Sequence, residues 1–313
     1  MGLQRSLFVL VLCLTFSLGN QVNAEEISLL SNPGPKDNAL WLIDPDTGQH
    51  YGQVGYYPPD SRWHIAQWGI LNRLPAKTKR YGKGWKTQNK DGSVSYLPSP
   101  SGGYVVDFKQ DSRNPNYGST EFDLFLEPNH FIYPTLPQNL MHYDNQPSLG
   151  SLTAVLMKAW QMIVYAWHGE RGSLMTGIPG SDLASTLLAV AMINPYTSPQ
   201  QILFYQVITY DSRGLVFNKD WFDNGTWDEP YMTYGVDDSV QNYGMQALTI
   251  GNERRYNLNI IDRLKQVVQE GPASLDKDLH HWKVAGGLYF GSWVNGEAVI
   301  HSKISSIDFT YKM

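Results

Sequence analysis

The feature that most constrains the fold is a succession of short apolar runs, rich in β-branched and aromatic residues and nearly all bounded by Gly, Pro, Asn, Asp or Ser. Such residues favour extended backbone, and turn-rich spacers between them are typical of antiparallel sheets rather than of alternating strand and helix units. The runs lie at residues 39–44, 63–70, 103–108, 121–127, 185–193, 201–210, 282–289 and 298–311. The sequence therefore predicts an all-β protein, an antiparallel β-sandwich of jelly-roll type, with residues 39–313 as a single domain.

Three segments add detail to this sandwich. The first run meets a turn signal at residues 45–48, which predicts a hairpin. Residues 152–167 fit a long buried strand and a helix about equally well, and we favour the strand. Residues 259–269 predict one peripheral amphipathic helix, with Asn259 able to cap its first turn. Its apolar stripe consists of Ile260, Ile261, Leu264, Val267 and Val268.

The first 24 residues have the form of a secretory signal peptide. Arg5 precedes an apolar run at residues 7–18, and Val22-Asn23-Ala24 suits signal peptidase. The run is too short to span a bilayer, and no later stretch reaches the ~18–20 apolar residues that a membrane span needs. The only cysteine, Cys13, lies inside the signal. A thiol-free chain of this length can fold without disulfides, so we expect a bacterial periplasmic or secreted protein, with residues 25–38 as a leader.

Charge and metal-ligand spacing exclude several classes of function. The formal net charge is -5, which provides no basic field to attract nucleic acid. The eight histidines show no zinc-ligand spacing, and no Gly-x-Ser-x-Gly motif marks a serine hydrolase. We expect no cofactor. A structural calcium ion would need the oxygen-rich stretches of the chain, whose spacing matches no EF-hand loop; these stretches contain Asp220, Asp223, Asp228, Glu229, Asp237 and Asp238.

The segment with the most chemistry is the acidic run at residues 119–128. In a strand, its apolar residues Phe122, Leu124 and Leu126 point to one face. The opposite face carries Glu121, Asp123, Phe125 and Glu127. Three carboxylates on one face repel one another unless water screens them or a ligand, metal or proton resolves the conflict. On a concave face they would equip a glycosidase, whereas on an outer wall they would be a solvated surface, and both interpretations remain open.

This acidic run resembles the Glu-x-Asp-x-x-Glu box of laminarinase-type glycoside hydrolases, which are concanavalin-like jelly rolls. The resemblance covers seven residues, and the last Glu comes one residue later in this chain. It implies Glu121 as the nucleophile, Asp123 as its neighbour in the network and Glu127 as the acid/base. Six strand residues span ~20 Å, whereas paired catalytic carboxyls lie ~5.5 Å apart in retaining enzymes and ~6.5–9.5 Å apart in inverting ones. Glu121 and Asp123, ~7 Å apart, lie within the inverting range, whereas Asp123 and Glu127 need the sheet to curve.

Aromatic side chains supply the candidate binding residues. The chain has 10 Trp and 19 Tyr, whose rings can stack on the C–H faces of sugars. Trp221 and Trp227 lie in a polar stretch, residues 218–229, that shows no strand or helix period and is predicted to be a loop. Trp68 and Trp85 complete the predicted substrate-binding set.

The leading hypothesis is a secreted protein that binds a polysaccharide or other glycan, with hydrolysis by the strand carboxylates as its enzymatic form. A polysaccharide lyase would need a Tyr or His base near an Arg or Lys that binds a uronate, and the sequence shows no diagnostic cluster. Two non-catalytic alternatives stay open. One is a lectin that binds through residues 221–227, and the other is a structural envelope protein whose aromatic residues fill a large sandwich.

Overall fold

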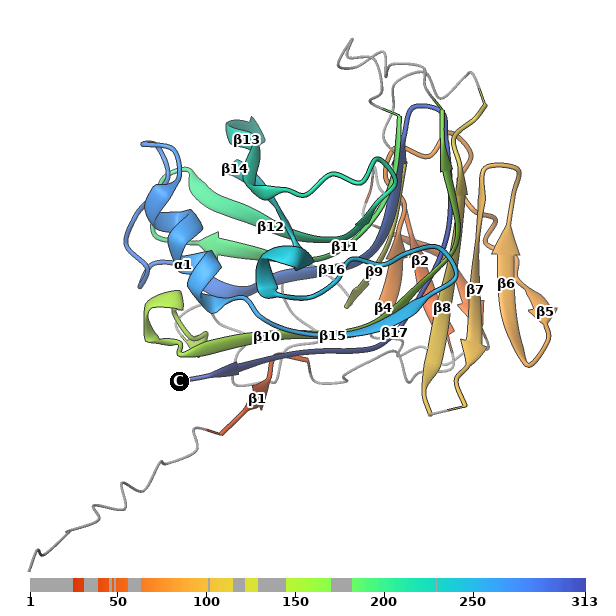
Figure 1. The fold of residues 1–313 in the computed structure, drawn as a ribbon, viewed down its shortest axis with the longest axis horizontal. Coiled ribbons are helices and arrows are strands. Elements are labelled where there is room, and N and C mark those ends of the chain that lie inside the picture. Colours follow the sequence, from red (N-terminus) through yellow and green to blue (C-terminus); the bar gives the residue numbers. More distant parts are fainter. Residues whose placement is uncertain are drawn as a thin grey trace, which may run out of the picture.

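Two β-sheets packed face to face make up most of the described chain (Figure 1). This computed structural model describes residues 25–30, 39–44, 47, 49–55, 63–100, 102–114, 122–128, 145–169, 182–228 and 230–313. The predicted signal peptide lies outside them. The sandwich confirms the predicted fold class. None of the helices in the described ranges is long and apolar enough to span a bilayer.

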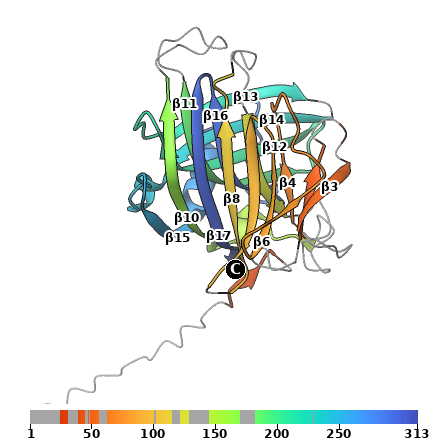
Figure 2. The same cartoon turned by 90° about the vertical axis from the view of Figure 1, so that its right-hand side faces the viewer.

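The first sheet has eight strands and forms the outer layer of the bent sandwich; Figure 2 shows β10, β17, β8 and β6 standing side by side. All of its pairings are antiparallel. The order is β15 (Glu253–Asn259), β10 (Ala154–His168), β17 (Ala298–Lys312), β8 (Tyr104–Asp111), β7 (Gly92–Pro98), β6 (Gly84–Gln88) and β5 (Lys79–Tyr81). The short strand β1 (Ile27–Ser28), within the segment expected to be a leader, pairs with β17.

The second sheet has nine strands and lies on the inside of the bend (Figure 1). Its pairings are antiparallel except for two parallel ones, β12 with β14 and β2 with β4. The order is β13 (Asn218–Asp228), β14 (Tyr231–Ser239), β12 (Gln200–Asp211), β11 (Leu183–Asn194), β16 (Lys283–Asn295), β9 (Phe122–Pro128), β4 (Trp63–Ala66), β2 (Ala39–Ile43) and β3 (His50–Gly55).

The main hydrophobic core lies between the sheets, and a second cluster covers the inner face of the nine-stranded sheet. Alternation along β9 separates the two, because Phe122, Leu124 and Leu126 belong to the main core whereas Phe125 belongs to the second cluster. The predicted orientation of this strand is therefore confirmed. The second cluster consists of Ala66, Phe125, Leu183, Leu187, Ala189, Ala191, Ile193, Ile202, Ile208, Tyr289 and Trp293. A sheet that is apolar on both faces can hold a ligand on the face that its partner sheet leaves open.

The ambiguous segment and the predicted helix both form as expected. Residues 154–168 are strand β10, and α1 (Ile261–Glu270) buries the predicted stripe. The helix begins one residue later than Asn259 would require as its cap, since Ile260 occupies that position. Asn259 Oδ1 instead accepts hydrogen bonds from the amides of Val155 and Ile261, which joins the start of the helix to β10. Two short 3-10 helices are η4 (Leu149–Ser151) and η5 (Val240–Tyr243).

Residues 218–228 form strand β13 and not the loop that the sequence predicted. The reason is a series of three register shifts against β14, between Asn218 and Asp220, between Trp221 and Asp223 and between Asn224 and Thr226. Each bulge adds a residue and resets the alternation of side chains. An irregular edge strand of this kind has no period of two for a sequence pattern to show.

Candidate functional site

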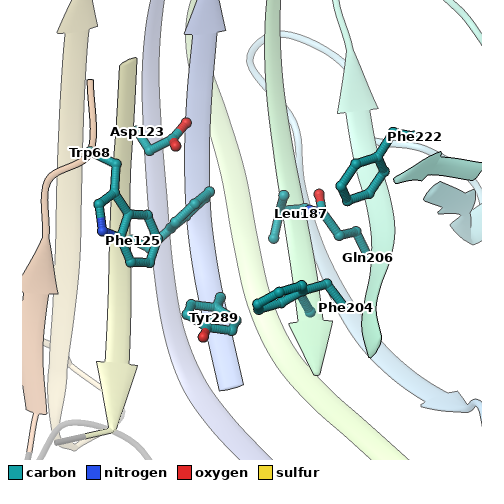
Figure 3. A pocket seen from close by; sticks show the side chains of 9 residues that line it. Trp68, Asp123, Phe125, Leu187, Phe204, Gln206, Phe222 and Tyr289 are labelled. Atoms are coloured by element: carbon teal, nitrogen blue, oxygen red, sulfur yellow. The ribbon is translucent and has the colours of Figure 1, made fainter. Parts of the chain in front are cut away.

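A cavity of about 250 Å³ opens on the inner face of the nine-stranded sheet (Figure 3). Strands β9, β11, β12, β13 and β16 supply eight of its residues, and the segment after β4 supplies Trp68. The lining consists of Trp68, Asp123, Phe125, Leu187, Ala189, Phe204, Gln206, Phe222 and Tyr289. We call it the inner-face pocket.

Strand register brings these residues together from distant parts of the chain. Ala189 in the centre of the sheet lies opposite Tyr289 on one side and opposite Gln206 on the other. Directly opposite residues share a face of the sheet, so their side chains point into the same space. Because alanine has only a methyl group, it leaves a floor between the phenol ring and the amide.

Four aromatic rings form a connected wall around Tyr289. Its ring centroid lies 5.8 Å from that of Trp68, 6.3 Å from that of Phe125 and 6.0 Å from that of Phe204. Trp68 and Phe125 also meet edge to face at 5.6 Å. Such tilted and edge-on contacts are the favoured geometries of aromatic pairs, and they hold each ring in one orientation. The pocket is therefore preformed by its own lining.

Asp123 is the only carboxylate among the residues that line the pocket. It is largely buried, at 8% exposure, and its backbone amide donates a 2.9 Å hydrogen bond to the carbonyl of Trp68. That bond fixes the indole and the carboxylate beside each other, as Figure 3 shows. Gln206 supplies the amide on the opposite side of the pocket. A few polar groups in an apolar cavity are the usual means of orienting a ligand.

Glu127 lies on the same face of β9 but does not line the pocket. Its Oε2 is 2.6 Å from Nε2 of His64, which lies directly opposite on β4. Both side chains are buried, at 6% and 2% exposure. Its Oε1 is buried and has no hydrogen-bond partner within the described part of the chain. Burial, together with the charge of Glu127, raises the pKa of Tyr289 well above its ordinary value, so the phenol remains a proton donor at neutral pH.

The two described acids of the predicted catalytic set stand far apart along one strand. Asp123 and Glu127 are separated by four residues, or ~13 Å of strand, which exceeds the ~5.5 Å of retaining pairs and the ~6.5–9.5 Å of inverting pairs. Glu121 lies outside the described residues. Both described acids are buried and therefore do not form a solvated outer wall. The catalytic roles of the three acids stay predictions.

Of the four predicted binding tryptophans, the structure brings only Trp68 to this pocket. Trp221 is partly buried against the main core, and Trp227 is 54% exposed on β13. Trp85 lies on β6 in the other sheet, with the guanidinium of Arg80 4.2 Å from its ring centroid. The side chain of β13 that does reach the pocket is Phe222.

The oxygen-rich stretches do not form a metal site in the ranges that the structure describes, where no three His, Cys, Asp or Glu side chains are grouped to hold an ion. Asp223 instead accepts hydrogen bonds from the hydroxyls of Thr226 and Thr233. Glu229 lies outside the described residues.

Sequence reasoning missed most of the pocket. Phe204 and Gln206 lie two residues apart in a run already predicted to be a strand, so that their shared face could have been inferred. Tyr289 ends another such run. No sequence signal showed that these strands and β9 would be near neighbours, since their order in the sheet differs from their order in the chain.

Comparison with known proteins finds similarity of fold alone. No protein family and no curated protein matches the sequence. Three solved structures are similar at low identity. The family 11 xylanase from Neocallimastix patriciarum is 8% identical, with a TM-score of 0.36 over 79% of this chain and 95% of that one. Trichoderma harzianum endoglucanase 3 from family GH12 is 9% identical, with a TM-score of 0.34 over 82% and 99%. The endo-1,4-beta-glucanase CelB2 is 9% identical, with a TM-score of 0.36 over 74% and 96%. The resemblance expected from the sequence, to jelly-roll glycanases at the level of the fold, is of this kind.

Proposed function

We propose that this protein binds a glycan, with a sugar ring seated in the inner-face pocket. The observation that supports this most directly is the combination of an aromatic wall with one carboxylate and one amide in a single cavity. Sugar rings present C–H faces that pack on aromatic rings, and their hydroxyls need a few fixed polar partners. Asp123 and Gln206 stand on opposite sides of the pocket, as such a ligand requires.

The size of the pocket suits one sugar unit of a longer chain. Its volume of about 250 Å³ falls just below the range of roughly 300–1,000 Å³ that is typical of sites for whole small molecules. The remaining units would extend along the inner face of the sheet. The signal-like first 24 residues support a location outside the cytoplasm, where polysaccharides are the abundant ligands of this class.

Binding rather than cleavage is the function that the described residues support best. The only carboxylate in the pocket is Asp123, and the next acid on that face, Glu127, is hydrogen-bonded to His64. Paired-carboxylate hydrolysis needs a second acid within ~10 Å of the first. Hydrolysis with Glu121, Asp123 and Glu127 is therefore tested separately.

The experiment is a glycan array followed by calorimetric titration of the strongest ligand. We expect Trp68→Ala to weaken binding by about tenfold or more, because about 1.4 kcal/mol of stacking energy corresponds to that factor. Trp227→Ala is the matched control, since its indole is exposed and does not line the pocket. Loss of binding in Trp227→Ala with normal binding in Trp68→Ala would instead place the site on β13.

Assay of reducing ends with the same ligand separates binding from hydrolysis. The binding proposal expects no product above the protein-free rate. Product that the unmodified protein forms, and that Asp123→Asn or Glu121→Gln abolishes, would show that the pocket also cleaves its ligand.

A further inference from the structure

A dense run of cations without an acid interrupts an otherwise acidic chain. Residues 73–90 contain seven of the 24 Lys and Arg residues and no Asp or Glu, although the whole chain has a net charge of -5. The seven are Arg73, Lys77, Lys79, Arg80, Lys83, Lys86 and Lys90. They lie on and beside the hairpin of β5 and β6, which Figure 1 shows at the right-hand edge of the outer sheet.

The hairpin places like charges against each other. Its two-residue loop begins with Gly82 at φ +56°, a value typical of the first loop position in type II′ turns. This register sets Lys79 directly opposite Lys86. Like charges at directly opposite positions destabilise a strand pair, so stability alone does not explain the arrangement.

The cations converge on a cavity of about 410 Å³. The hydroxyl of Thr87 donates a 2.7 Å hydrogen bond to the carbonyl of Pro75, which holds the segment before β5 against β6 and closes one side. We call this cavity the basic pocket. It is lined by Pro75, Lys77, Lys79, Arg80, Tyr81, Lys86, Thr87 and Gln88, with no acid among them.

The charges of this pocket are not neutralised by the described protein. Lys77, Lys79, Arg80 and Lys86 make no ion pair within 4.0 Å in the described part of the chain. Burial, and then the nearby charge of Lys109, lower the pKa of Lys86, although Asp107 opposes the change. An anion between these side chains would relieve the repulsion.

Edge protection, a membrane surface and a nucleic acid fit this pocket less well than a small bound anion does. Lysine on an edge strand blocks edge-to-edge pairing of sheets, but that role does not require a cavity. A membrane surface or nucleic acid would meet the acidic remainder of the molecule, whose charge acts over the ~8 Å Debye length. A membrane-binding face also presents several apolar side chains, whereas the only exposed aromatic ring in the lining is that of Tyr81, at 49%.

We propose that the basic pocket binds an anionic sugar unit, a carboxylate- or sulfate-bearing residue of an acidic polysaccharide. Ammonium and guanidinium groups donate charge-assisted hydrogen bonds to the anion, and the ring of Tyr81 packs against the sugar face. The basic pocket is in the other sheet, so this inference does not rest on the function of the inner-face pocket.

Titration with defined polymers tests the proposal. The acidic probes are polygalacturonate and dextran sulfate, and the neutral probes are fully methyl-esterified pectin and dextran. We expect the unmodified protein to bind at least one acidic probe and neither neutral one, more weakly as salt rises. Binding of polygalacturonate alone identifies the carboxylate as the recognised group, and binding of dextran sulfate alone identifies the sulfate.

Variants locate the site. We expect Lys79→Gln/Lys86→Gln to weaken binding by about tenfold or more, since hydrogen bonds to charged groups contribute about 1.5–3 kcal/mol each. Its melting temperature should not fall, because the substitutions remove a repulsion. Arg255→Gln/Lys312→Gln is the matched control, with the same change of charge on β15 and β17, away from the hairpin. Trp68→Ala should bind the acidic probe normally, which separates this site from the inner-face pocket.

Three results would overturn the proposal. One is the absence of binding to either acidic polymer at low salt. Another is an equal loss in the two double variants, which would show that net charge alone drives binding. The third is tighter binding to phosphatidylglycerol vesicles than to either polymer, which would make a membrane surface the partner.

Discussion

At the scale of single residues, the pair formed by Glu127 and His64 shows what sequence patterns reach and what they do not. Alternation along the strand predicted which face Glu127 occupies, and the structure agrees. Its partner is 63 residues away in the chain and meets it only because β4 pairs with β9. A pairing between distant strands leaves no local signal, so the burial of this acid could not be predicted.

The same pair makes a prediction about stability. We expect His64→Ala to lower the free energy of unfolding by about 3 kcal/mol or more, because it removes the hydrogen-bond partner of a buried carboxyl group. Urea denaturation measures the loss, with His280→Ala as the control at an exposed histidine. Adding Glu127→Leu should restore part of the stability. A loss no larger than that of His280→Ala would contradict this account of the pair.

At the scale of elements, the helix α1 is held to the nine-stranded sheet by a buried carboxylate. Arg263 of the helix donates from Nε and Nη2 to both carboxylate oxygens of Asp238, which is fully buried at the end of β14. The hydroxyl of Tyr205 donates to the same group. Burial raises the pKa of Tyr205, so its phenol remains protonated and the carboxylate keeps this donor.

We expect Arg263→Met to destabilise the protein by about 3–5 kcal/mol, since breaking a buried pair leaves an uncompensated charge. The amides of residues 261–270 should lose protection from hydrogen exchange in this variant. The matched control is Arg255→Met, at an exposed arginine on β15. Equal denaturation midpoints for the two variants would show that Arg263 does not hold the helix.

The elements also show where pattern reading succeeds. Residues 261–270 keep one unbroken helical period, and the helix was predictable. Strand β10 was a choice between two structures with similar patterns, and burial in the sheet decided it. Strand β13 was missed because its three bulges remove the period of two. That error carried Trp221 and Trp227 into the predicted binding set and left out Phe222.

At the scale of the whole molecule, the bend of the sandwich and the order of its strands create the candidate sites. The sequence predicted the sandwich and the acidic strand, but β16 comes between β11 and β9 only in the folded sheet. The segment between β4 and β5 then contributes to both pockets, with Trp68 in one and Lys77 in the other. The aromatic wall and the basic edge are therefore products of topology.

The most direct test of the glycan-binding proposal is a crystal structure of the protein with the oligosaccharide selected on the array. We predict a sugar ring within van der Waals contact of Trp68 and Tyr289, with a hydroxyl hydrogen-bonded to Asp123 or Gln206. A saturating ligand that lies against Trp227 and leaves the inner-face pocket empty would contradict the proposal.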